Sequence, residues 1–121
     1  RRLTLLGRMD DDLMDSIIAY YPQSTAGDHV SSVIYRSHSD PEWPTSSART
    51  VLNIHDALIA LCKIEVRDKV ARIYKKYAEA PIPIVGVDGK TRELIVPAEF
   101  GYSEADEHGV HRWSTIKKVK I

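Results

Sequence analysis

The stretch between Pro44 and Pro81 contains no glycine or proline, and it restricts the possible folds of this chain more than any other segment. Its first half carries a mostly apolar set of residues at spacings of three and four, namely Ala48, Val51, Leu52, His55, Leu58, Ile59 and Cys62. That spacing places the side chains on one face of a helix, and Thr45 or Ser46 can cap its first turn. The sequence therefore predicts a helix over residues 46–61.

The second half of this stretch, residues 63–79, has two interpretations. In the first, the helical stripe continues toward Ala80 through Val66, Val70, Ile73 and Tyr77. In the second, Ile64 and Val66 alternate with charged neighbours before a turn at Asp68-Lys69, after which a second strand returns. A single helix over residues 46–80 would be about 50 Å long, which is awkward for a domain of this size. The hairpin is therefore the preferred interpretation.

Two further helices are expected nearer the N-terminus. Asp10-Asp11-Asp12 supplies an N-cap and carboxylates for a first turn, and apolar residues at helical spacing follow at Leu13, Met14, Ile17, Ile18 and Tyr21. Pro22 ends this pattern, which predicts a first helix over residues 11–21. Gly27-Asp28 indicates a turn and a new N-cap, so a short second helix is expected to end near Ser37. A loop with two prolines follows.

The last third of the chain is β-rich. Ile84–Val87 and Thr91–Val96 are joined by an Asp88-Gly89 turn, which is the signature of a β-hairpin. A polar loop is expected over residues 101–109 and a last strand over residues 110–121. The predicted fold class is therefore α+β, with a three-helix N-terminal part followed by β-hairpins. We expect a single domain over residues 1–121, with a helical part at about 10–78 and a hairpin extension at about 81–121.

Charge is distributed unevenly along the chain. The whole sequence has 17 basic and 17 acidic residues, but residues 43–78 alone have seven basic and three acidic side chains. A local basic surface of this kind is what contact with phosphate groups requires. The single cysteine, Cys62, excludes an internal disulfide and a cysteine-rich zinc site, and it favours a cytoplasmic location. No apolar run approaches the roughly 20 residues of a membrane span.

The predicted third helix opens with the residues Thr45-Ser46-Ser47-Ala48-Arg49-Thr50-Val51, and it closes with Ala57-Leu58-Ile59-Ala60-Leu61-Cys62-Lys63-Ile64-Glu65-Val66-Arg67-Asp68. These segments resemble the third helix of the winged-helix DNA-binding family, which ends in a phrase such as Leu-Gly-Leu-Ile-Glu before a β-hairpin wing. Cys62 and Lys63 stand where that family has glycine and an aliphatic residue. The resemblance covers about residues 10–78. It implies a winged-helix-like domain that binds duplex DNA as a transcription regulator, or as an accessory factor in replication or recombination.

The expected DNA contacts fall into two groups. In the first half of the third helix, backbone N–H groups and hydroxyls can bind phosphate, while arginine and asparagine can read guanine and adenine edges in the major groove. These residues are Ser46, Ser47, Arg49, Thr50 and Asn53. The basic residues that would decorate the wing and flank the DNA backbone are Arg67, Lys69, Arg72, Lys75 and Lys76.

Enzymatic patterns are weaker. His108 and His111 could ligate one metal ion, but the spacing fixes no third ligand. His55-Asp56 resembles the doublet of metal-dependent phosphohydrolases, although the other ligands of that family are missing at recognisable spacing. No nucleophile motif or glycine-rich phosphate loop is present. We therefore expect no enzyme activity, no metal and no cofactor.

A protein-interaction or assembly module is the alternative function. In that interpretation the basic segment meets an acidic partner surface, and DNA has no role. The exposed hairpin at Asp88-Gly89 and the tail from Val110 would add strands or arms to a neighbour, either a second copy in a homodimer or another protein.

Overall fold

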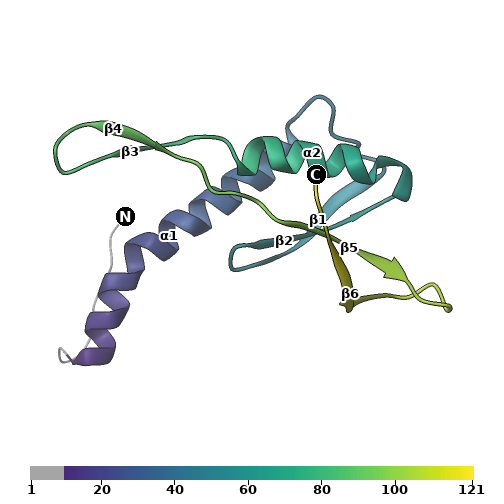
Figure 1. The fold of residues 1–121 in the computed structure, drawn as a ribbon, viewed down its shortest axis with the longest axis horizontal. Coiled ribbons are helices and arrows are strands. Elements are labelled where there is room, and N and C mark those ends of the chain that lie inside the picture. The colour runs from purple at the N-terminus through teal and green to yellow at the C-terminus, as the bar shows by residue number, and fades with distance from the viewer. Residues whose placement is uncertain (1–9) are drawn as a thin grey trace.

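The computed structural model describes residues 10–121, apart from the side chains of Ile17 and Tyr21. Within that range the chain has two α-helices, one short 3-10 helix (η1) and six strands (Figure 1). In chain order these are α1 Asp11–His38, β1 Ala48–Ile54, β2 Ala57–Cys62, η1 Ile64–Val66, α2 Arg67–Ala78, β3 Ile82–Val85, β4 Thr91–Leu94, β5 Phe100–Ala105 and β6 His111–Val119. The six strands form three separate antiparallel hairpins, β1–β2, β3–β4 and β5–β6. The class is α+β, but the predicted three-helix N-terminal part is wrong.

α1 replaces the first two predicted helices with one continuous helix. The predicted start is correct, since the Asp10 side chain accepts a hydrogen bond of 2.8 Å from the Leu13 N–H. The predicted end at Pro22 is wrong, because the helix continues through this proline. Within a continuous helix, Pro22 removes one backbone hydrogen bond. Two separate helices would instead leave about four carbonyls at the end of the first and four N–H groups at the start of the second without intrahelical partners. The helix bends in its first half instead (Figure 1).

The predicted third helix over residues 46–61 is also wrong, because this segment forms the β1–β2 hairpin. Ile54 pairs with Ala57 across a two-residue turn in which His55 has a φ of 54°. Leu58, Ala60 and Cys62 pack against the core, and these residues alternate along β2 as inward-facing strand residues do. The same side chains satisfied a helical spacing, so periodicity alone did not separate the two structures.

Residues 67–78 are helical rather than a hairpin, so the preferred interpretation of residues 63–79 is wrong as well. In α2 the buried residues are Val70, Ala71, Ile73 and Tyr74, which lie on one face of the helix. This helix does not continue the preceding segment, because η1 separates it from β2. A single helix of about 50 Å over residues 46–80 therefore does not form, because residues 48–54 and 57–62 are strands.

The C-terminal predictions fare better. The β3–β4 hairpin is confirmed, and Gly89 adopts a φ of 72° in its turn, a conformation that glycine adopts without steric cost. β6 confirms the last strand. The polar loop predicted over residues 101–109 is wrong in its first half, because β5 extends to Ala105 and pairs with β6.

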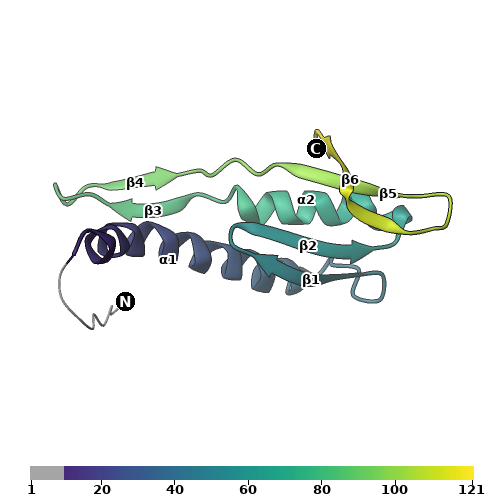
Figure 2. The same cartoon turned by 90° about the horizontal axis from the view of Figure 1, so that it is seen from below.

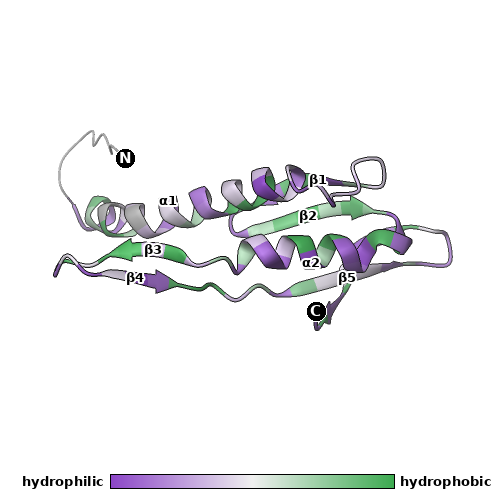
Figure 3. Ribbon diagram, turned by 90° about the horizontal axis from the view of Figure 1, so that it is seen from above, coloured by the Kyte–Doolittle hydropathy of each residue, from purple (hydrophilic) through white to green (hydrophobic). Residues whose placement is uncertain are grey.

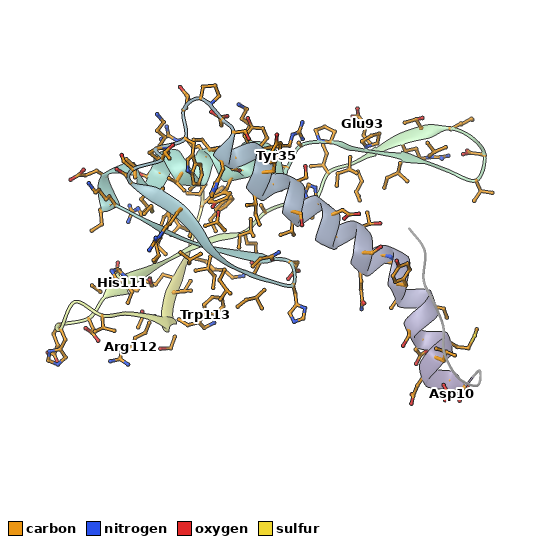
Figure 4. The ribbon with its side chains drawn as sticks, turned by 180° about the vertical axis from the view of Figure 1, so that it is seen from behind. Asp10, Tyr35, Glu93, His111, Arg112 and Trp113 are labelled. Carbon is orange, nitrogen blue, oxygen red and sulfur yellow. The ribbon has the colours of Figure 1, made fainter. Side chains whose placement is uncertain are left out.

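The core lies where α1, β1 and α2 meet. It consists of the buried side chains of Val33, Trp43, Ala48, Val70, Ile73 and Tyr74. Among the described side chains of α1, those that take part lie in its second half, namely Val33 and neighbouring Val30. The first half of α1 and the β3–β4 hairpin project away from this core and diverge from each other, as Asp10 and Glu93 show near their ends (Figure 4).

Candidate interaction surfaces

The residues predicted to contact DNA are distributed over a loop, a strand and a helix. Ser46 and Ser47 lie in the loop before β1, and Arg49, Thr50 and Asn53 lie on β1. No helix presents these five residues, so a reading helix in a major groove is not available to them. The five basic residues all lie on α2, namely Arg67, Lys69, Arg72, Lys75 and Lys76.

Thr50 makes hydrogen-bond contacts that connect parts of the fold. Its hydroxyl lies 2.9 Å from His38 Nε2 and 2.5 Å from the Tyr74 hydroxyl, so it connects β1 to both helices. Trp43 packs beside the same group, with its ring 4.5 Å from the His38 ring and 5.3 Å from the Tyr74 ring. Thr50 therefore fastens the hairpin to the core and is not free for a nucleic acid.

α2 has three exposed basic side chains, Lys69, Arg72 and Lys76, which line the same pocket. With Asp40 and Glu42 they surround a shallow pocket of about 370 Å³. The two carboxylates leave this face with a net charge of about one positive unit. The electrostatic attraction for phosphate is correspondingly weaker than the sequence count indicated.

The remaining two basic residues of α2 are engaged elsewhere. The Arg67 guanidinium lies over the Tyr102 ring at 4.5 Å from its centroid. Lys75 Nζ donates a hydrogen bond of 2.7 Å to the backbone carbonyl of Ile121. Both contacts attach the C-terminal hairpin to α2, and neither residue extends the exposed basic face.

Asp40 is the one buried carboxylate of this region. It accepts hydrogen bonds from the Tyr77 hydroxyl at 2.7 Å and from Lys76 Nζ at 2.9 Å, and from the Glu42 N–H at 2.9 Å. These bonds lower the pKa of Asp40 to about 2, and the Asp40 carboxylate in turn raises the pKa of Lys76. Asp40 therefore anchors the loop after α1 to the end of α2.

The β3–β4 hairpin forms an arm, residues 82–94, whose first strand is apolar and whose second strand is mostly polar. Its main contacts are between its own two strands. Val85 is 68% exposed, and Val87 at the turn is fully exposed. The hydropathy colouring shows apolar residues along β3 and mostly hydrophilic residues along β4 (Figure 3). The turn itself is held by a bidentate ion pair between Asp88 and Arg92, at 3.0 and 2.7 Å.

A groove of about 960 Å³ lies beside α2, and it is lined by β2, by the start of β5, by α1 between Pro22 and Val33, and by Ile82, Ile84 and Leu94 of the β3–β4 hairpin. Its floor is the apolar face of α2, including Val70, Ala71 and Tyr74. Cys62 lies in its wall, where burial raises the pKa of the thiol. The sequence pattern does not predict this groove, because β2 and β5 are almost forty residues apart. The available signal was the uncharged run Ala57–Cys62, which the helical interpretation assigned to a helix face.

The two histidines proposed as metal ligands do not form a site. His108 lies 3.6 Å from Glu107, and His111 Nδ1 lies 3.0 Å from the Ser103 carbonyl oxygen. His111 shares β6 with Arg112 and Trp113 (Figure 4). Among the described residues no three histidine, cysteine or acidic side chains gather closely enough to hold a metal ion.

Comparison of the chain with protein-family models, with curated proteins and with solved structures gave no match. Between residues 10 and 121, neither helix combines the length and the apolar character that crossing a membrane requires.

Proposed function

We propose that the chain is an assembly module whose copies associate through their projecting arms. The supporting observation is the size of its surface, 9625 Å², where a folded monomer of 13.7 kDa exposes about 6,600 Å². Even if residues 1–9 contributed the full surface of an unfolded segment, about 1,500 Å², an excess of roughly 1,500 Å² would remain. A standard interface covers about 800 Å² on each partner. The excess is therefore large enough for one or two such contacts.

The β3–β4 arm is the surface that most directly suggests contact with a second copy of the chain. An isolated two-stranded hairpin is at best marginally stable in water, so an arm with exposed Val85 and Val87 gains stability when another surface covers it. The net charge of zero removes the repulsion that keeps highly charged proteins apart. Ile84 and Leu94 of the arm are also partly exposed, but they line the groove beside α2.

Sedimentation velocity over a range from low to high micromolar concentration tests this proposal. Replacing Val85 and Val87 by threonine keeps the β-branched shape and removes apolar area. Full burial of one valine contributes about 1.5 kcal/mol, so the double variant loses roughly 2.5 kcal/mol when the exposed fractions are taken into account. We expect its association to be about 70-fold weaker. Val51→Thr on β1 is the matched control, with a half-exposed valine outside the arm.

Two results would contradict the proposal. One is a wild-type chain that stays monomeric at every concentration. The other is a Val85→Thr/Val87→Thr variant that associates as tightly as the wild type. The proposed location remains the cytoplasm, which the single unpaired cysteine supports.

Duplex DNA binding is a second candidate function, and the exposed basic face of α2 is the observation in its favour. Fluorescence anisotropy with a mixed-sequence duplex at several salt concentrations tests it. Lys69→Ala and Arg72→Ala are each expected to reduce the logarithmic salt slope by about one unit. Lys90→Ala, on the β3–β4 arm, is the control. Absence of binding at low salt excludes this candidate, and it leaves the assembly proposal unaffected.

A further inference from the structure

The two walls of the groove run in the same direction. β2 ends at Cys62, and η1 then leads directly to the N-terminal end of α2. Residues 98–102 also run toward that end: the Ala98 N–H donates a hydrogen bond of 3.2 Å to Glu79 at the far end of α2, while Tyr102 lies under Arg67 at the near end. β2 and β5 are therefore both antiparallel to α2 and parallel to each other, as Figure 2 shows.

The edges that face the groove lack a strand partner among the described residues. β2 pairs with β1, and β5 pairs with β6, in each case along one edge only. The lining residues include members of β2 and β5, but none of β1 or β6. Within residues 10–121, each inner strand therefore has one edge whose N–H and C=O groups have no strand partner, and each contributes residues to the lining of the groove.

Along the groove, these two inner edges also lack the features that protect the other strand edges from pairing. β2 contains no charged residue and no proline, and β5 has its one charged residue, Glu104, and its register shift at Ser103–Ala105, beyond the residues that line the groove. The other strands carry such features: a bulge and Arg49 in β1, Pro83 in β3, Arg92 and Glu93 in β4, and Arg112, Lys117 and Lys118 in β6. The contrast indicates that the two inner edges are kept available for pairing.

We propose that the groove is a peptide-binding site that takes one extended strand from a partner protein. A strand placed antiparallel to both β2 and β5 would complete a five-stranded antiparallel sheet, in the order β1-β2-partner-β5-β6, over α2. Alternate residues of this strand would face the apolar floor formed by Val70, Ala71 and Tyr74. This site adjoins the arm, because Ile84 and Leu94 also line the groove, but Val85 and Val87, which carry the proposal for self-association, do not.

The direction of the bound strand follows from the same geometry. A strand antiparallel to β2 begins beside Cys62 and ends beside Asp56, which lines that end of the groove with Glu99. Glu99 already accepts a 2.7 Å hydrogen bond from Lys118, so the net charge of these three side chains is one negative unit. The partner strand is therefore expected to carry a basic residue just after its apolar part.

A labelled synthetic peptide of alternating valine and threonine, with a C-terminal lysine, is the probe for this site. We expect it to bind in fluorescence anisotropy, and to slow hydrogen exchange at amides of both β2 and β5. A peptide with N-methyl groups at alternate positions keeps its side chains but loses the N–H donors of one edge. Its affinity should fall at least tenfold. Measurements in the Val85→Thr/Val87→Thr background separate peptide binding from self-association.

An Asp56→Lys variant tests the direction. Asp56 lies exposed in the β1–β2 turn, so this change leaves the core intact. We expect the variant to prefer a peptide that ends in glutamate over the one that ends in lysine. Equal binding of the N-methylated and unmodified peptides would overturn the proposal, as would absence of new protection in β2 or β5. A third result would also overturn the proposal: faster hydrogen exchange at β2 amides when an oligomer of the chain dissociates. That result would mean that a second copy of the chain, and not a partner protein, occupies the groove.

Discussion

The hydroxyl of Thr50 offers the sharpest test of how the β1–β2 hairpin is attached to the helices. Tyr74 is 8% exposed, and its hydroxyl has Thr50 Oγ1 as its hydrogen-bond partner at 2.5 Å. A Thr50→Val change keeps the shape of the side chain but leaves the Tyr74 hydroxyl buried without this partner. Such a group costs about 1–3 kcal/mol. Tyr74→Phe removes the hydroxyl itself, while Thr50 retains His38 as a partner, so its expected cost is only about 0.5–1.5 kcal/mol.

The double variant then distinguishes this explanation from simple loss of packing. Once Tyr74 has become phenylalanine, no buried hydroxyl is left unsatisfied by Thr50→Val. We therefore expect the double variant to be no less stable than Thr50→Val alone, with a coupling energy of about 1 kcal/mol in a double-mutant cycle. Urea unfolding measures this directly, since 1 kcal/mol shifts the midpoint by roughly 0.5 M in a small protein. Additive losses, with a coupling below about 0.3 kcal/mol, would refute the role of Thr50 as a connection between β1 and α2.

Two further predictions concern the core and the buried carboxylate of Asp40. The pKa of Asp40 is lowered from 3.8 to about 2, so its ionised form stabilises the fold above about pH 4, and this stabilisation is lost as the pH falls from about 4 to about 2. The urea midpoint measured across this range should fall less steeply in Asp40→Asn than in the wild type; equal slopes would contradict the pairing. Ile73→Val in the core should cost about 0.5–1.5 kcal/mol in urea unfolding, whereas Ile64→Val, 80% exposed, should change stability by less than about 0.5 kcal/mol.

Local chemistry was enough to predict part of this fold. Asp10 caps α1 because its carboxylate reaches the Leu13 N–H, a contact between residues three positions apart. The β3–β4 hairpin follows from Asp88-Gly89, because glycine adopts the positive φ that the turn requires. In both cases the decisive atoms lie within a few residues of each other. The surrounding structure was not needed to make either prediction.

Tertiary packing decided the segments in which two periodicities were both satisfied. Leu58 and Cys62 lie four residues apart and fit either a helix face or alternate positions of a strand. In the folded protein both residues pack against the core from a strand. The helix that packs against the same core is α2, through Val70 and Tyr74. The continuation of α1 past Pro22 has a related cause. The second half of α1 packs against the core through Val33. The packing of this half therefore favours a helix that continues past Pro22.

The candidate sites show the same division. Sequence alone identified the basic residues of α2 and the exposed hairpin, because charge and turn chemistry are properties of neighbouring residues. It did not identify the pairing of Asp40 with Lys76, or the groove between β2 and β5. Those features join segments that are distant along the chain. The residues that form these features become neighbours only after the chain has folded. No local sequence pattern indicates which unpaired strand edge will face another.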